Sequence, residues 1–187
     1  MRNLGVLYER CLTRAPLATK MATGGSLALL GDIAAQTIQQ HRELDIRRTL
    51  TFGGVGVWWT GLAQHYHLSF LAAVFPGGTS TAVCKKVFVS TCLTHPLVFM
   101  PAFFAWNGKV YSRISNEEIW RRFQAEAPTC VLTMWAMWIP ANAIMFAYVP
   151  LPMQVLFVSL ISFGWNVALS LLYSYRSGLT LSASHTK

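Results

Sequence analysis

Asp32 is the side chain whose chemistry fits its surroundings least well. It lies near the middle of a long apolar stretch, residues 16–40, and Gln36 follows one helical turn later. A carboxylate at membrane depth costs roughly 2.5–3.5 kcal/mol on insertion scales, so it is normally turned inward, paired or hydrated by a cavity. Two interpretations remain open: a hydrogen-bonding anchor between helices, or a residue that lines a pore or solute path.

Histidine is the other residue type that could carry chemistry. His65 and His67 alternate along one stretch and would point about 200° apart on a helix, so they cannot easily share a metal ion. No HExxH pattern is present, and no motif combines an acid, a base and a nucleophile. We therefore expect no metal, no cofactor and no enzymatic activity. The residues predicted to line a polar path are Asp32, Gln36, His65, His95, Asn142 and Asn166.

Proline interrupts two of the apolar stretches, at Pro96 and Pro101 in one and at Pro140 in another. A helical proline removes an i→i−4 hydrogen bond, which for Pro96 would free the carbonyl of Cys92. In lipid, a freed carbonyl must be satisfied by protein or by water in a cavity. The prolines predict either broken helices beside an internal polar path or plain kinks that improve packing.

Small residues recur at helical spacing in the first two apolar stretches. Small side chains let a neighbouring helix approach closely, which is how helix bundles pack in lipid. These stretches are therefore predicted to pack tightly inside a bundle. The predicted helix-packing residues are Gly24, Ala28, Gly31, Ala35, Gly53 and Gly61.

The composition determines what kind of molecule holds these residues. Hydrophobic residues make up 53% of the 187 residues and charged residues only 12%, whereas a soluble domain carries about 25% charged residues. The net charge of +8 comes from short basic clusters between apolar runs. This placement favours contact with anionic lipid headgroups over nucleic-acid binding. The four cysteines have no CxxC spacing and are predicted to be small buried hydrophobes.

The predicted fold class is all-α, a polytopic transmembrane bundle of four to five membrane helices with short amphipathic interfacial helices. A spanning helix needs about 20 mostly apolar residues, and no stretch shows the period-two alternation of a barrel. The apolar stretches are 16–40, 49–75, 81–106, 129–149 and 151–175. One membrane domain, 1–187, is expected to comprise an amphipathic segment 1–15, a bundle 16–175 and a polar tail 176–187.

Two segments have the pattern of amphipathic helices. The first, 1–15, carries three arginines and one acid, which is typical of a mitochondrial targeting helix or of a helix lying in the membrane plane. The second is predicted at 115–125, where Ser115 can cap the helix and Glu117 and Glu118 occupy its first turn.

The C-terminal third resembles one known family of small organelle membrane proteins. The stretch from Trp138 to Gln154, followed by Trp165-Asn166, is similar to the pattern of the Mpv-seventeen / peroxisomal membrane protein twenty-two family. Gly31-Asp32 with Gln36, and Gly61 with His65, are also similar to that family, so the likeness covers nearly the whole chain. The residues that match the C-terminal family motif are Trp138, Phe146, Val149, Pro150, Trp165, Leu169 and Ser170.

The chain also departs from the family pattern at several polar positions. Ser90-Thr91 stands where the family usually has Asp-Gln, Asn142 where it has Gln, Met145 where it has Asn, and Gln154 where it has Arg. A member that has lost these groups is a weaker candidate for a polar pore.

The resemblance implies a multi-pass protein of the mitochondrial inner membrane, or alternatively of the peroxisomal membrane. It further implies a weakly selective channel that takes part in mitochondrial homeostasis and needs no cofactor. The lost polar residues motivate an alternative, in which the chain is a structural accessory subunit of a larger mitochondrial membrane complex. The expected partners are membrane lipids, and a membrane protein complex or a second copy of the chain.

Overall fold

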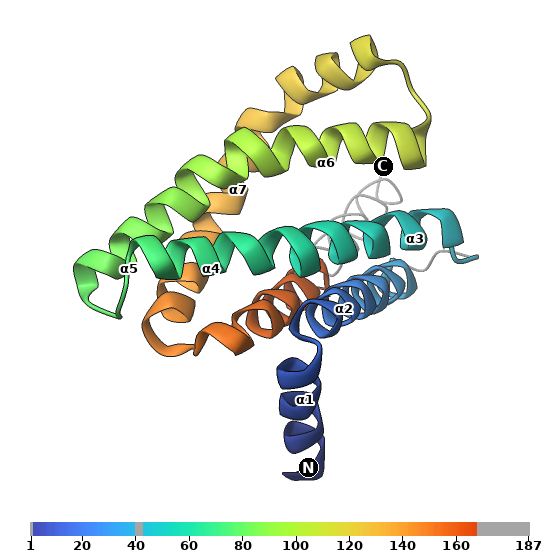
Figure 1. The fold of residues 1–187 in the computed structure, drawn as a ribbon. Helices are drawn as coiled ribbons and strands as arrows, with labels where there is room; N and C mark the ends of the chain where they lie inside the picture. Colours follow the sequence, from blue (N-terminus) through green and yellow to red (C-terminus); the bar gives the residue numbers. More distant parts are fainter. Residues whose placement is uncertain (1, 40–42, 168–187) are drawn as a thin grey trace, which may run out of the picture.

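The computed structural model describes residues 2–39 and 43–167, and this part is almost entirely helical, with no strand in it (Figure 1). The all-α prediction is therefore confirmed for the described residues. The elements are α1 (Arg2–Arg14), α2 (Pro16–Ile38), α3 (Ile46–Val55), η1 (Gly56–Ala63), α4 (Gln64–Val74), α5 (Ser80–Val87), η2 (Phe88–Phe99), α6 (Met100–Trp106), η3 (Asn107–Ser112), α7 (Asn116–Tyr148) and η4 (Leu151–Met153). The η4 turn opens a C-terminal helix, Leu151–Val167.

Several of these elements join end to end into longer rods. The segments α3, η1 and α4 form one continuous rod, and α5 to η3 form a second, Ser80–Ser112. The segments η1, η2 and η3 are π-helical, with i→i+5 hydrogen bonds, so the rods change their hydrogen-bonding register without breaking. Each rod begins at a side-chain cap: Asp45 accepts from the Arg48 N–H, and Thr79 from the Ala82 N–H.

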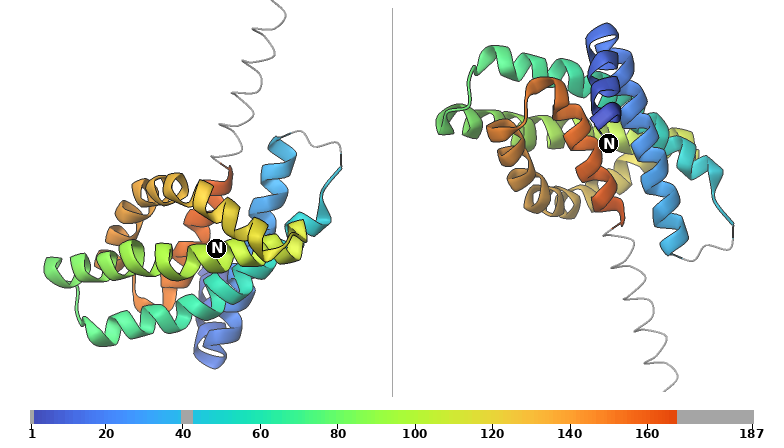
Figure 2. Two further views of the ribbon diagram at one scale, coloured as in Figure 1. Left: turned by 90° about the horizontal axis from the view of Figure 1, so that it is seen from above. Right: turned by 90° about the horizontal axis from the view of Figure 1, so that it is seen from below.

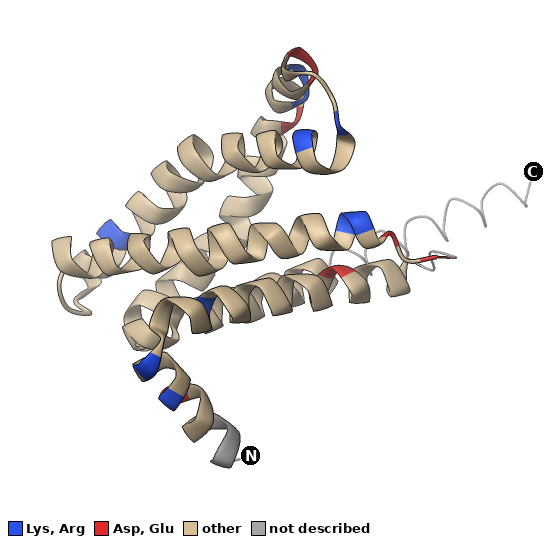
Figure 3. Cartoon of the chain, turned by 45° about the vertical axis from the view of Figure 1, so that its right-hand side comes forward, with Lys and Arg blue, Asp and Glu red and all other residues tan. Residues whose placement is uncertain are grey.

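Two of the described helices are long and apolar enough to cross a membrane, namely Ser80–Ser112 and Asn116–Tyr148. Large apolar side chains on both point outward: Leu97 is 70% exposed and Leu132 is 66% exposed. Figure 3 shows charged residues mainly near helix ends, with long uncharged stretches between them. Outward-facing apolar side chains without charges fit a lipid environment. The larger number of four to five spans stays a prediction.

The prediction of a separate amphipathic helix at 115–125 is wrong. Ser115 does cap a helix, since its hydroxyl accepts from the Glu118 N–H, but that helix continues as α7 to Tyr148. The helix passes through Pro128 without a break, and Pro128 and Gln124 are both exposed. The carbonyl left free by the proline can therefore bond to solvent.

The prolines do not break the helices, and the freed carbonyl is not that of Cys92. Pro96 lies inside the π-helical η2, where each N–H normally donates to the carbonyl five residues earlier. Because proline has no N–H, the carbonyl of Thr91 is the one left without a backbone donor. The indole N–H of Trp135 donates to this carbonyl at 3.0 Å. A side chain from α7 thus satisfies the group that the proline leaves free, and Pro140 likewise lies inside the continuous α7.

The closest backbone approach in the described residues joins α2 to η1. A Cβ atom added to Gly24 would overlap the carbonyl oxygen of Gly56, and one added to Gly61 would overlap the backbone of Met21. Ala28 lies beside Gly56, while Gly53 faces the end of the Leu29 side chain. Helices can approach so closely only where no side chain separates them.

Further along the same face, α2 packs against the C-terminal helix (Figure 2). A Cβ atom on Gly31 would lie 3.2 Å from the Asn166 amide nitrogen and 3.5 Å from the Phe163 ring. Ala35, one turn after Gly31, is buried. A separate apolar core gathers α4, α5, α7 and the C-terminal helix around Leu68, Leu71, Val87, Met145, Phe146, Val155 and Val158.

The α2–η1 contact leads to a stability prediction. Gly24→Ala should lower the free energy of unfolding by about 1–3 kcal/mol, because the new methyl group meets backbone that cannot move aside. The measurement is thermal or denaturant unfolding of the protein purified in mild detergent. The matched control is Gly164→Ala, where a Cβ atom meets nothing within 4 Å. The control should be neutral or slightly stabilising, and equal losses for the two variants would contradict the close packing.

Candidate functional site

Asp32 is buried and fully engaged by neighbouring side chains. It is 3% exposed, and Arg48 Nε lies 2.9 Å from its Oδ1. The Thr49 hydroxyl and the Gln36 amide donate to its Oδ2 at 2.8 Å and 2.7 Å. The carboxylate charge is therefore compensated by one guanidinium group and two further donors, which is what a buried charge requires.

The same hydrogen bonds extend to the start of α3 and to η3. The Gln36 side-chain oxygen accepts from the Asp45 N–H at 2.7 Å, and the Tyr111 hydroxyl donates to Asp45 Oδ2 at 2.8 Å. We call Asp32, Gln36, Asp45, Arg48, Thr49 and Tyr111 the Asp32 cluster. It connects the end of α2, the start of α3 and the end of η3. This geometry corresponds to the hydrogen-bonding anchor, the first of the two interpretations of Asp32.

His65 and Asn142 lie in two other places. Lys20 Nζ, which is buried, lies 3.0 Å from His65 Nδ1 and connects α2 to α4. The Asn142 amide donates to the Thr91 hydroxyl at 2.8 Å, which connects α7 to η2. Two of the positions at which the chain departs from the family pattern, Thr91 and Asn142, are thus direct partners.

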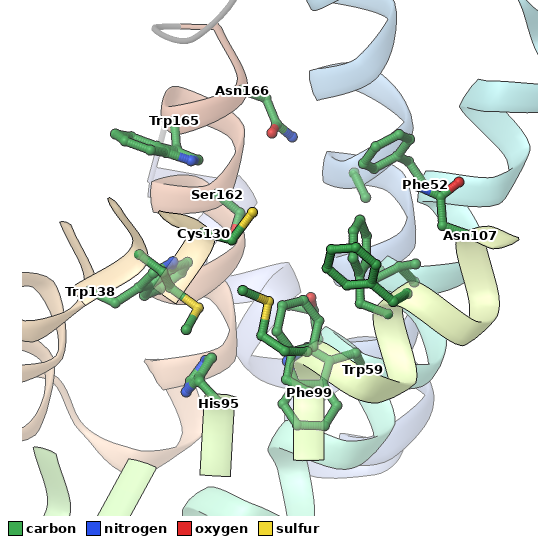
Figure 4. Close-up of a pocket in the computed structure, with 18 of the residues that line it drawn as sticks. Phe52, Trp59, His95, Phe99, Asn107, Cys130, Trp138, Ser162, Trp165 and Asn166 are labelled. Carbon is green, nitrogen blue, oxygen red and sulfur yellow. The ribbon is translucent and has the colours of Figure 1, made fainter. Parts of the chain in front are cut away.

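A cavity of about 510 Å³ lies between the helices, apart from the Asp32 cluster. Its wall is formed by the α3–η1–α4 rod, the Ser80–Ser112 rod, α7 and the C-terminal helix. Figure 4 shows Trp165, Ser162 and Asn166 on one side and Phe52 and Asn107 on the other. The wall is mostly aromatic and aliphatic, with Trp59, Phe99, Phe103 and Trp138 among its rings.

Polar atoms in this wall lack partners. Gln64 is only 4% exposed, and neither its Oε1 nor the buried Oδ1 of Asn107 has a hydrogen-bond partner among the described residues. Both residues line the cavity. A buried amide oxygen without a partner costs about 1–3 kcal/mol, unless water or a ligand donates to it. Three further buried atoms without a partner, Trp58 Nε1, His67 Nε2 and Gln154 Oε1, belong to residues outside the wall, so such atoms are not confined to the cavity.

His95 contributes an aromatic and polar surface to the wall. Its Nδ1 lies 2.6 Å from the Ser90 carbonyl oxygen, so Nδ1 carries the hydrogen and Nε2 is left as an acceptor in the neutral ring. Its ring stacks on Trp138 at 6.0 Å between centroids and meets Trp59 edge to face at 6.1 Å. These contacts fix the orientation of the imidazole.

The structure does not bring the six predicted path residues together. His95 and Asn166 line the cavity, whereas Asp32, Gln36, His65 and Asn142 do not. Of the family-motif residues, Trp138 and Trp165 line it, Phe146 lies in the apolar core, and Val149-Pro150 forms the turn after α7. Leu169 and Ser170 lie outside the described residues. No three His, Cys, Asp or Glu side chains gather to hold a metal in ranges 2–39 and 43–167.

The sequence analysis missed Gln64, Asn107 and Glu126, which also line the cavity. One signal was available: Glu126, Thr129, Cys130 and Thr133 recur at i, i+3, i+4 and i+7. That spacing places a polar or weakly polar stripe on one face of an otherwise apolar helix. Glu126 lies between the two predicted helices, 115–125 and 129–149, so the stripe was not predicted as one helix face.

The ion pair between Asp32 and Arg48 predicts an unequal loss of stability when one or the other partner is replaced. Arg48→Met leaves a carboxylate that is almost fully buried without its cation and should cost about 3–5 kcal/mol of stability. Asp32→Asn leaves an arginine that is 26% exposed and can rehydrate, so it should cost about 1–3 kcal/mol. Denaturant unfolding of both single variants and the double variant measures this. Strictly additive losses in the double variant would exclude coupling between the two side chains.

Asp45 predicts a pH dependence of stability. The Arg48 backbone N–H, followed by the Tyr111 hydroxyl, holds the pKa of the Asp45 carboxyl below its ordinary value of 3.8. A lowered carboxyl pKa contributes stability that is complete above the unfolded value and is lost as the pH falls through the native value. The stability difference between wild type and Asp45→Asn should be constant near neutral pH and shrink below about pH 4. A difference that grows on acidification would contradict the assignment.

Comparison with known proteins agrees with the motif resemblance. The profile described as the Mpv17 / PMP22 family matches residues 110–170. The chain is 32% identical over 181 residues to PXMP2/4 family protein 2 of Dictyostelium discoideum, covering 91% of each chain. It is 30% identical over 165 residues to the peroxisomal membrane protein PMP22 of Arabidopsis thaliana, covering 88% of this chain and 86% of that one.

A mitochondrial relative is similar to a comparable degree. The mitochondrial inner membrane protein Mpv17 of Bos taurus is 28% identical over 169 residues, with 87% of this chain and 93% of that protein covered. No solved structure gives a significant match. With two relatives at 30% identity or more over most of both chains, the chain belongs to the Mpv17 / PMP22 family of membrane proteins.

Proposed function

We propose that this chain provides a weakly selective path for small solutes through an organelle membrane, and that the path runs through the cavity between the helices. The observation that carries the proposal is the cavity itself, which has a volume of about 510 Å³ and is large enough for water and small solutes. Hydroxyl, amide and imidazole side chains on its otherwise apolar wall can form hydrogen bonds with such an occupant.

The chemistry of the wall favours weak selectivity. The polar groups on it are single hydroxyl, amide and imidazole groups spread over four helical segments, such as Thr60, His95, Thr133 and Ser162. Tight recognition of one ligand requires several converging polar groups. Scattered groups on an aromatic wall instead allow many small solutes to pass with brief contacts.

The organelle in this proposal is a mitochondrion, at its inner membrane, or a peroxisome. Relatives of both kinds are similar to the chain to a comparable degree, so the likeness supports an organelle membrane more strongly than either choice. The α1 helix carries Arg10 and Arg14 and exposes Val6 and Leu7. A helix of this kind is suited to mitochondrial targeting or to the surface of a membrane.

A second candidate function is that of an accessory subunit in a mitochondrial membrane complex. Met145 supports it, because this apolar residue is 1% exposed and fills the core at a position where the family pattern has Asn. A scaffold that only packs against partners can replace polar groups by apolar ones in this way. A subunit of this kind would migrate with a larger assembly in mild detergent and would show no conductance alone.

The cavity can be tested by filling it. Thr133→Trp places an indole on the cavity wall, whereas Leu132→Trp places the same group on the adjacent outward-facing position. In planar bilayers containing the purified protein, wild type and Leu132→Trp should conduct alike, and Thr133→Trp should lose most of the conductance. Equal conductance of all three proteins would remove the cavity from the path. Absence of conductance in wild type would favour the accessory subunit.

A further inference from the structure

The charged residues around the cavity are distributed unevenly. Glu126 is the only acidic residue in the wall, and no Lys or Arg of the described residues lines it. This is unexpected in a chain with a net charge of +8. Glu126 forms no ion pair within the described ranges, so its negative charge is not neutralised by a neighbouring cation.

Five basic residues near this end of the bundle are engaged elsewhere. Arg48 pairs with Asp32, and Arg121 and Arg122 both pair with Glu118 at 2.8 Å. Arg47 donates to the Val110 carbonyl. Lys109 donates to the Ile114 carbonyl at 3.2 Å. Each of these side chains is held at a partner outside the cavity wall, so none of them supplies a binding group for an anion inside it.

Glu126 lies where the charged part of α7 meets its apolar part. Four charged residues lie from Glu117 to Arg122, and the apolar stretch 129–149 follows Glu126. A helical stretch of this length is about 30 Å long, which matches the thickness of the hydrocarbon core. The exposed Glu126 carboxylate therefore lies close to the boundary of the hydrocarbon, where water can reach it.

We propose that Glu126 is the residue that determines which charges enter the cavity: it admits cations and uncharged solutes and disfavours anions such as carboxylates and phosphates. The inference rests on the proposed function only in taking the cavity to be open to water. A fixed negative charge between apolar walls raises the local concentration of cations and lowers that of anions. No basic side chain among the described residues lines the wall, so none of them offsets this effect for an anion.

The reactivity of the Cys130 thiol can measure the effect of Glu126 on charged reagents. It follows Glu126 by one helical turn on the same face of α7, and it also lines the cavity. A variant that keeps Cys130 and replaces the other three cysteines (Cys11→Ser, Cys84→Ser, Cys92→Ala) can be modified by methanethiosulfonate reagents. These reagents exist in cationic, anionic and neutral forms. Their rates at Cys130, each divided by the rate with a free small thiol, measure the local preference for charge.

The cationic reagent should react about tenfold faster than the anionic one after this normalisation. A unit negative charge about 6 Å away in water raises the local concentration of a cationic reagent about threefold and lowers that of an anionic reagent about threefold. The two factors together give a ratio of about ten. Glu126→Gln keeps the size of the side chain and should bring the ratio close to one. Glu126→Asp keeps the charge and should keep the preference, which separates the loss of charge from a general disturbance of the helix.

A second single-cysteine variant provides the matched control. Cys84 is exposed beside Lys85, far along the chain from Glu126. A variant that keeps Cys84 and carries Cys130→Ser should react with the anionic reagent at least as fast as with the cationic one. The ratio of these two normalised rates should not change with Glu126→Gln. Detergent-solubilised protein and protein in nanodiscs of neutral phosphatidylcholine give the two environments for comparison.

The outcomes separate this inference from the proposed function. Equal normalised rates for both charges at Cys130, or a ratio that survives Glu126→Gln, would overturn the role of Glu126 and leave the path in place. Failure of all three reagents, including the neutral one, would show that water does not reach the cavity and would overturn the inference as well. A tenfold ratio that depends on Glu126, in a protein without conductance, would support the charge preference and reject the path.

Discussion

The constraint on which this structure depends is that polar groups between membrane helices must find their partners within the protein. Asp32 satisfies it with a guanidinium group and two side-chain donors, which brings α2, α3 and η3 together at one end of the bundle. The Thr91 carbonyl satisfies it with the indole of Trp135. These hydrogen bonds are directional and join different helices, so they specify which helices meet and at what depth. Apolar packing in lipid specifies this less well.

The cavity differs from the Asp32 cluster in how its polar residues are paired. Gln64 and Asn107 come from two different rods and line the same cavity, and the side-chain oxygen of each has no partner among the described residues. The Asp32 cluster pairs its charges inside the protein and holds helices together. Glu126 in the cavity wall, in contrast, forms no ion pair within the described ranges. A residue's polarity alone does not distinguish the two, but its hydrogen-bond partners do.

The sequence predicted the helical class and most of the helix limits because long apolar runs and caps are local signals. Pro16 at the start of α2 and Ser115 at the start of α7 are examples. The π-helical register around Pro96 could not be predicted, since it depends on whether a partner such as Trp135 reaches the free carbonyl. The separate helix at 115–125 was inferred from its cap and its charge pattern, which are local signals and do not show that α7 continues to Tyr148. Because Glu126 lies between the two predicted helices 115–125 and 129–149, the stripe that contains it was not predicted.

The departures from the family pattern weaken the case for a pore less than the sequence alone indicates. Thr91 and Asn142 are smaller than the Asp-Gln and Gln of the pattern, but they still bond to each other and hold η2 to α7. Met145 and Phe146 pack with Leu68 and Leu71 in the apolar core, and neither of them lines the cavity. The unpartnered and charged groups of the cavity come from Gln64, Asn107 and Glu126, none of which belongs to the replaced positions. The replaced residues therefore affect the packing between helices, and the polar lining of the cavity does not depend on them.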